Sequence, residues 1–178
     1  PGLTPTIWRD DDRYARDYWT RIPRCYYTGD GAIKDADGYI WFVGRVDEVI
    51  KIAAHRVGTI EIESALLSHP AVAEAAVVGK PDQIRGEVAC AFVVLKPGHA
   101  PNDELKETLR GVVRKILGSV VVVGDILFVS KVPKTRSGKI MRRLIKAVVT
   151  SQPLGDYSTI EDATAIDEIK KAAGELRK

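Results

Sequence analysis

One stretch of the chain, residues 133–143, concentrates side chains that can take part in chemistry. It reads Pro-Lys-Thr-Arg-Ser-Gly-Lys-Ile-Met-Arg-Arg and holds five cations in eleven residues. A lysine at the tip of a loop, such as Lys139, is a mobile point charge that suits a site where a carboxylate meets a phosphate. The alternatives are a solvated basic loop and a nucleic-acid-binding patch. A Walker phosphate loop is excluded, because Pro133 and Ile140 stand where that motif needs Gly and Ser or Thr.

The elements around this stretch must position it. An apolar run over 126–129 precedes it, and an amphipathic segment over 140–148 follows it. This order predicts a strand, an exposed loop and a helix, with Ser137 capping the helix and Gly138 allowing a tight turn.

Composition bounds the function. The 178 residues are 45% hydrophobic with a net charge of +3, so one domain or slightly more is expected, and charge alone does not indicate nucleic acid. The two cysteines and three histidines are scattered, which predicts no metal site and reduced thiols in a cytoplasmic protein. No apolar run has the length of a membrane span. The start, Pro-Gly-Leu, is neither a signal peptide nor an initiator Met, so we expect a fragment of a longer chain.

The first 45 residues predict a short amphipathic helix, with Tyr14 and Tyr18 on one face, and then a β-hairpin around an Asp-Gly turn. Asp30 is placed to accept two hydrogen bonds from a ribose diol, or it is an ordinary turn aspartate. Arg45 and Asp47 lie between two ordered elements, where hinges occur; the alternative is a surface ion pair in a loop.

The order from residue 46 predicts β-β-α-β-β-α-β-α, a small sheet with helices packed on it. One helix follows Gly58, and strands are expected at 72–78 and 87–95. A second helix begins after Asn102 and ends at Gly118. Four valines at 120–123 favour a strand, and a further strand is expected at 126–129. The inner faces of the two helices are predicted to be Ile62, Ala65 and Leu66, and Leu105, Leu109, Val112, Val113 and Ile116. An extended strap and a frayed, charged helix are expected after residue 150.

Four ordered motifs closely resemble the C-terminal end of the adenylate-forming superfamily, and most nearly the AMP-forming acetyl-CoA synthetases. In chain order they are Tyr-x-Thr-Gly-Asp at 26–30, Gly-Arg-x-Asp-x-x-x-Lys at 44–51, His-Arg-x-Gly-Thr-x-Glu-Ile-Glu at 55–63 and Pro-Lys-Thr-Arg-Ser-Gly-Lys-Ile at 133–140. Residues 142–143 and 155–162 also look like the ending of that subfamily. The resemblance covers nearly the whole chain.

The resemblance implies an α+β fold: a small, mobile C-terminal lid domain with a short β-hairpin and a three-stranded sheet packed by helices. Residues 1–45 would be the end of a larger adenylation domain, 46–150 the mobile catalytic domain, and 151–178 a strap and tail. It also implies two half-reactions. ATP and acetate, or another short carboxylate, give an acyl-adenylate and pyrophosphate; the small domain then rotates, and CoA attacks to give a thioester and AMP.

The resemblance also implies roles for individual residues. Carried over by position, Lys139 is the adenylation lysine, Asp47 the hinge, and Asp30, Arg45 and Arg56 nucleotide-binding residues, while Ala54, Arg56 and Arg114 belong to the CoA site. Mg²⁺, ATP and CoA are expected to bind mainly through the missing N-terminal domain, and no metal site is expected in this chain. In bacterial relatives the matching lysine is a regulatory acetylation site, so an acetyltransferase and a deacetylase are possible partners.

Three residues depart from the family pattern. Ala54 replaces a glycine that lines the pantetheine tunnel, and the added methyl group narrows a close backbone approach. Ser119 and Val123 replace prolines. The expected function is therefore the C-terminal domain of an acetate–CoA ligase, inactive alone. The alternative is a stand-alone nucleotide- or nucleic-acid-binding module, or an interaction subunit that completes a large domain in trans.

Overall fold

The computed structural model describes residues 3–175. They divide into two compact units: the first ends at Asp47, and the second begins at Glu48. The first unit holds α1 (Asp11–Tyr14), a π-helical turn (Ala15–Trp19) and an antiparallel hairpin of β1 (Asp30–Lys34) and β2 (Ile40–Arg45). The predicted helix and hairpin are confirmed. The rings of Tyr14 and Tyr18 lie 5.6 Å apart, as residues on one helical face should.

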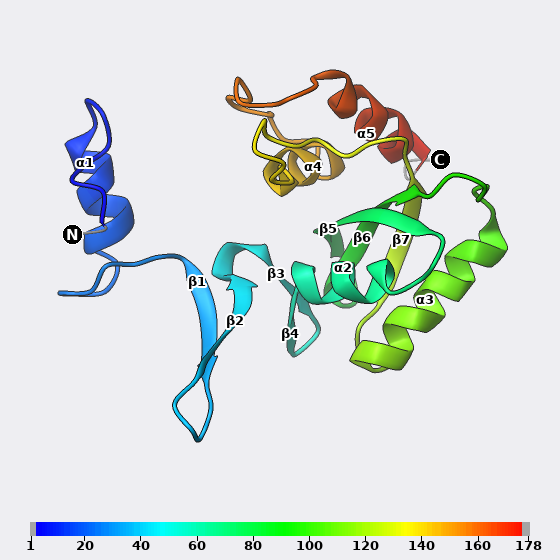
Figure 1. The fold of residues 1–178 in the computed structure, drawn as a ribbon, viewed down its shortest axis with the longest axis horizontal. Helices are drawn as coiled ribbons and strands as arrows, with labels where there is room; N and C mark the ends of the chain where they lie inside the picture. The colour runs from blue at the N-terminus through cyan, green and yellow to red at the C-terminus, as the bar shows by residue number, and fades with distance from the viewer. Residues whose placement is uncertain (1–2, 176–178) are drawn as a thin grey trace. The chain divides into compact units, whose positions relative to one another are not determined.

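The second unit is built on one five-stranded sheet (Figure 1). Its strands are β3 (Val49–Ile52), β4 (His55–Gly58), β5 (Val72–Asp82), β6 (Gly86–Leu95) and β7 (Val123–Phe128). Strands β5 and β6 form an antiparallel hairpin, and β7 lies parallel to β6. The predicted α+β fold is confirmed. The short hairpin β3–β4 does not stand apart, however, because the Ile52–Gly86 pair joins it to the three longer strands.

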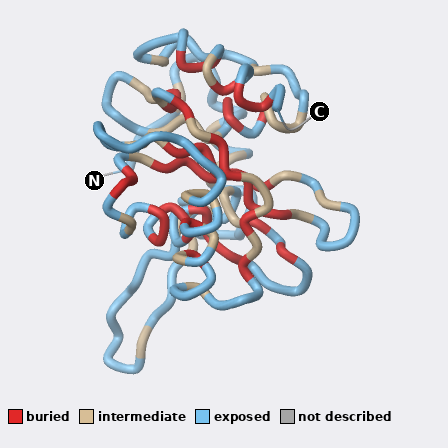
Figure 2. The backbone as a smooth tube through the Cα atoms, turned by 90° about the vertical axis from the view of Figure 1, so that its right-hand side faces the viewer, coloured by how far each residue is buried: buried red, intermediate tan, exposed pale blue. Residues whose placement is uncertain are grey.

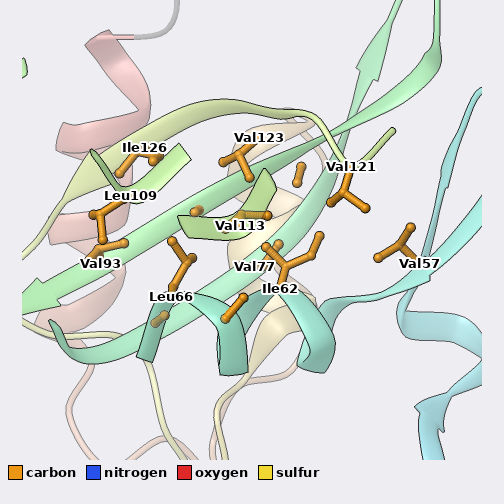
Figure 3. Close-up of a cluster of buried hydrophobic side chains, with 14 of the residues drawn as sticks. Val57, Ile62, Leu66, Val77, Val93, Leu109, Val113, Val121, Val123 and Ile126 are labelled. Atoms are coloured by element: carbon orange, nitrogen blue, oxygen red, sulfur yellow. The ribbon is translucent and has the colours of Figure 1, made fainter. Parts of the chain in front are cut away.

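Helices cover both faces of this sheet (Figure 1). On one face α2 (Thr59–Leu67) and α3 (Asp103–Leu117) pack on Val77 and Val93, with the side chains shown in Figure 3. On the other face α4 (Arg142–Val149) and α5 (Thr164–Gly174) pack on Val78 and Phe92. Side chains alternate between the two faces along a strand, and helices cover both faces. Strands β5 and β6 are therefore apolar on both sides. Their buried residues appear in red in Figure 2.

Residues 118–129 differ from the prediction. The run of valines is mostly turn and coil, and the strand begins only at Val123 and ends at Phe128. Val121 and Val123 are nevertheless buried, so apolar composition reflects burial here and not strand structure. On α3, Asn102 caps the helix as predicted, accepting a 2.7 Å hydrogen bond from the amide of Leu105. Ile116 does not belong to the inner stripe, because 53% of it is exposed.

The tail after residue 150 is also more ordered than predicted. Helix α5 packs against α4 and buries Ile166 and Ile169 together with three alanines, so it is not a frayed surface helix. Its start is anchored by Asp162, which accepts hydrogen bonds from Lys131 and from the hydroxyl and amide of Thr164. The predicted end of this helix, residues 176–178, lies outside the described residues.

We expect Asp162→Asn to lower the melting temperature of the protein at pH 7. Hydrogen bonding to Lys131, and then to Thr164, lowers the pKa of Asp162 from its ordinary 3.8 to about 2. A carboxyl group with a lowered pKa stabilises the fold above its unfolded pKa and loses that effect as the pH falls through its folded pKa. The difference between wild type and variant should therefore shrink between pH 3.8 and about 2.

Thermal unfolding at a series of pH values checks this prediction. Asp167→Asn is a suitable control, because Asp167 lies in the first turn of α5 and, among the described residues, forms an ion pair only with exposed Lys170. A pH-independent loss for Asp162→Asn, or an equal loss for the control, would contradict it.

Candidate functional site

The basic stretch forms a short, backbone-bonded loop between β7 and α4. Lys134 and Ile140 pair across it as an isolated bridge, and the amide of Thr135 donates to the carbonyl of Lys139 at 2.9 Å. The amide of Gly138 donates to the carbonyl of Thr135 at 2.8 Å, with Gly138 at φ +82°. The predicted turn at Gly138 is thus confirmed, because this left-handed conformation favours glycine.

Side chains and the strap fix the loop further. The Thr135 hydroxyl accepts from the amide of Lys139 at 3.1 Å and lies 3.0 Å from the Ser137 hydroxyl. Ser137 therefore does not cap the helix as predicted; Met141 occupies the N-cap position of α4. The strap pairs with the loop through Thr135 and Ile160, and the amide of Glu161 donates to the carbonyl of Lys134 at 2.9 Å.

Only two of the five cations are left unpaired at the tip. Lys134 Nζ lies 2.6 Å from Glu74 Oε1, and Arg143 donates to the carbonyls of Leu154 and Asp156. Lys139 and Arg136 are exposed, and within residues 3–175 their side chains have no hydrogen bond or ion pair. A backbone-fixed loop that ends in a free ammonium group, with no carboxylate bonded to it, fits an anionic reactant.

Arg142 has a different role from its neighbours in the basic stretch. Its guanidinium donates to both oxygens of Glu63, at 2.8 and 2.6 Å, and to Glu48 at 3.3 Å. Glu63 also accepts from the amide of Val77 at 2.8 Å. The side chains of Arg142 and Glu63 are only 14% and 7% exposed. Hydrogen bonding to Glu63 raises the pKa of Arg142 despite its burial.

The sequence does not predict this network: Arg142 belongs to the basic stretch and Glu63 ends the motif at 55–63, and nothing in their spacing pairs them. One signal in the sequence is the position of Glu63, which lies between Ile62 and Ala65, two residues of the inner face of α2. A carboxylate bordering an apolar face needs a buried partner, and arginine is the usual one.

Three of the predicted residues meet within the first unit. Arg45 Nε lies 3.1 Å from Asp47 Oδ1, and its Nη1 lies 3.4 Å from Asp30 Oδ1 and 2.8 Å from the carbonyl of Thr28. Asp30 and Asp47 thus share one guanidinium group. Their geometry is compatible both with the surface ion pair and with a ribose-binding carboxylate.

The predicted CoA residues lie on separate elements of the second unit. Ala54 is at the two-residue turn between β3 and β4, where Ala53 adopts φ +53°. Arg56 lies on β4 and Arg114 on α3; both are exposed. Over the described residues no hydrogen bond or ion pair joins either guanidinium group to another side chain or to Lys139.

Within residues 3–175, no group of three or more His, Cys, Asp or Glu side chains is arranged to hold a metal ion. None of the described helices is long and apolar enough to cross a membrane.

Residues 61–139 match the family model of the AMP-binding enzyme C-terminal domain. The matched segment runs from α2 to the loop and ends at Lys139. The resemblance to the C-terminal part of AMP-forming acetyl-CoA synthetases is confirmed by curated relatives that align with almost the whole chain.

The relatives are much longer than this chain. It is 60% identical over 177 residues to an acetyl-coenzyme A synthetase from Pyrobaculum aerophilum, and these residues are 99% of the chain but 26% of the relative. It is 52% identical to a 3-hydroxypropionyl-coenzyme A synthetase from Metallosphaera sedula, covering all of the chain and 27% of that protein. The chain thus spans about a quarter of the length of these relatives.

Solved structures agree on the fold. An acetoacetyl-CoA synthetase from Streptomyces lividans matches 96% of this chain and 26% of its own with a TM-score of 0.82, at 23% identity. The anthranilate CoA ligase AuaEII, solved with anthranoyl-AMP, matches 82% of this chain and 28% of its own with a TM-score of 0.72, at 33% identity.

Proposed function

We propose that this chain is the C-terminal domain of an ATP-dependent, AMP-forming ligase that joins acetate, or another short carboxylate, to CoA. Lys139 is the observation that carries the proposal. Its free ammonium group stands at the tip of a loop fixed by backbone bonds, at the end of the segment that matches the family. The relatives whose names specify acetyl-CoA and 3-hydroxypropionyl-CoA synthesis support a short acyl group.

In the first half-reaction a carboxylate oxygen attacks the α-phosphorus of ATP, and pyrophosphate leaves. Both reactants are anionic, so bringing them together is costly. Lys139 offsets this cost by placing one cation between the carboxylate and the α-phosphate oxygens. Asp30 accepts hydrogen bonds from the ribose hydroxyls, and Arg45 contacts the ribose or phosphates. ATP and Mg²⁺ are otherwise held by the rest of the protein.

In the second half-reaction the second unit rotates about Asp47, and the CoA thiol attacks the acyl carbonyl so that AMP leaves. Arg56 and Arg114 then contact CoA. Both residues are exposed, and within residues 3–175 neither guanidinium group has a partner, so each is available to bind a phosphate. Ala54 lines the pantetheine path. The methyl group of Ala54 narrows this path. Thioester formation is therefore the step that depends most on the width of the tunnel, which the upstream domain helps to form.

The large domain is supplied either in cis or by a separate chain. The apolar side chains of the first-unit hairpin support a missing partner surface, because Trp41 and Phe42 are 62% and 78% exposed. This chain alone is expected to be inactive. Acetylation of Lys139 by an acetyltransferase would remove the charge that adenylation needs, and a deacetylase would restore it.

A stand-alone nucleic-acid-binding module is the weaker alternative. Three cations of the basic stretch are occupied by intramolecular partners, Glu74, Glu63 and two carbonyl groups. Few free charges remain to neutralise phosphates along a nucleic acid.

Carboxylate-dependent exchange of pyrophosphate into ATP tests the proposal. The full-length parent is assayed with acetate and, separately, with 3-hydroxypropionate, and the 178-residue chain is assayed alone and mixed with a separately produced upstream part. Exchange by the parent or by the mixture, but not by this chain, is expected. A parent without exchange for any short carboxylate would overturn the proposal, and RNA binding with a steep salt dependence would favour the alternative.

A further inference from the structure

The ion pair between Arg142 and Glu48 joins the base of the lysine loop to the proposed hinge, which have separate roles in the proposed mechanism. Arg142 is the first residue of α4, three residues after Lys139. Glu48 is the first residue of the second unit and directly follows Asp47, the proposed hinge. Their side chains meet at 3.3 Å and are 14% and 22% exposed. The base of the lysine loop is therefore tied to the residue at which the second unit begins.

The anchor on the other side of Arg142 is stronger. Glu63 takes two hydrogen bonds from the guanidinium group and one from the amide of Val77 on β5. Arg142 is thus held on the sheet through Glu63, and its remaining Nη1 reaches Glu48. Loss of Glu48 leaves the Glu63 contact in place, whereas loss of Arg142 breaks both.

We propose that Glu48 is a positioning residue for adenylation: through Arg142 it holds the Lys139 loop in a fixed orientation relative to the hinge. This inference rests on the proposed function. In the proposed mechanism, rotation about Asp47 sets the orientation of the second unit. The Glu48–Arg142 pair connects the residue after the hinge to the base of the loop, so the loop takes the same orientation. Without the pair, the loop keeps its own backbone bonds but its ammonium group samples more orientations relative to the first unit. Adenylation needs that orientation to be precise.

The test compares Glu48→Gln with Glu87→Gln in the full-length parent. The two changes are matched, because each removes one negative charge paired with α4; Glu87 lies 3.7 Å from Lys146 and makes no ion pair with Arg142 in the described structure. Glutamine also keeps an acceptor for the Lys51 amide, which Glu87 binds at 2.9 Å. Three quantities are measured: pyrophosphate exchange, acetyl-CoA formation from supplied acetyl-adenylate, and melting temperature.

Glu48→Gln is expected to lower kcat for exchange about fivefold with an unchanged KM for ATP, an effect typical of one coupled contact. For the same variant, acetyl-CoA formation from acetyl-adenylate should stay within about twofold of wild type, because the proposed role of Lys139 is confined to the first half-reaction. Glu87→Gln should resemble wild type in both assays. Exchange equal to wild type for Glu48→Gln would overturn the inference. So would equal losses in both half-reactions, which would indicate a merely structural role. A wild-type parent without exchange would instead contradict the proposed function.

Discussion

Replacement of Lys139 by alanine should reduce acetate-dependent pyrophosphate exchange of the full-length protein by about a hundredfold to a thousandfold, the loss typical of removing one electrostatic group aimed at developing charge. Stability should be unchanged, because the side chain is exposed and makes no hydrogen bond or ion pair within residues 3–175. The loss should appear in kcat more than in KM, since the proposed role of the ammonium group is at the point where carboxylate and phosphate react.

The design of this experiment separates a local charge effect from a general one. Lys170→Ala is the control, because Lys170 is also a surface lysine, and its one ion pair in the described part of the chain is with Asp167 on α5. Lys139→Arg tests geometry, since the wider guanidinium group keeps the charge yet cannot occupy the same point. Formation of acetyl-CoA from supplied acetyl-adenylate should survive in Lys139→Ala. Exchange within about threefold of wild type would contradict the assigned role.

The second large effect concerns stability. Arg142→Ala should lower the free energy of unfolding by about 3 kcal/mol, because it leaves the buried Glu63 carboxylate without its charge partner. Glu63 would keep only the amide of Val77 as a hydrogen-bond donor. Urea unfolding of the 178-residue chain followed by far-UV circular dichroism measures this. Tryptophan fluorescence is unsuitable, since Trp8, Trp19 and Trp41 all lie in the first unit.

Two variants decide whether the loss comes from the unpaired charge. Lys146→Ala removes an exposed ion-pair cation from the same helix and should cost less than about 1 kcal/mol. Arg142→Met combined with Glu63→Gln should be more stable than Arg142→Met alone, because the amide keeps an acceptor for Val77 without a buried charge. Equal stability of Arg142→Ala and wild type would show that water replaces the guanidinium group at no cost.

Much of the fold could be predicted because local signals agreed with packing. Asn102 and Gly118 mark the ends of α3, and the inner face of α2 follows its helical spacing. The sequence reading failed where burial came from distant segments. Helix α5 is rich in charged residues, yet its five buried apolar residues stand at amphipathic helical spacing, and the helix packs against α4. The sequence carries that spacing but not the identity of the distant segment that covers it. Likewise the valines before β7 are buried without being a strand.

The candidate site shows the same division. The turn at Gly138 and the exposure of Lys139 could be predicted, because glycine favours the left-handed conformation of a tight turn and a lysine beside it points to solvent. The pairing of Arg142, Arg143 and Lys134 within the chain could not be predicted, because their partners lie between 11 and 94 residues away in sequence. Side-chain pairs at such separations leave no periodic pattern. The roles of Asp30, Arg45, Asp47, Arg56, Ala54 and Arg114 stay predictions.

Strand β6 contributes to both hydrophobic clusters, since Ala89, Ala91 and Val93 face one and Cys90 and Phe92 face the other. It also pairs with three of the other four strands. Neither pair of helices can therefore detach without exposing part of the same strand. Amide protons of β6 should exchange with solvent only when the whole second unit opens, in one cooperative event. In the proposed rotation about Asp47, such a unit would turn as one rigid piece, and the lysine loop would keep its place on it throughout.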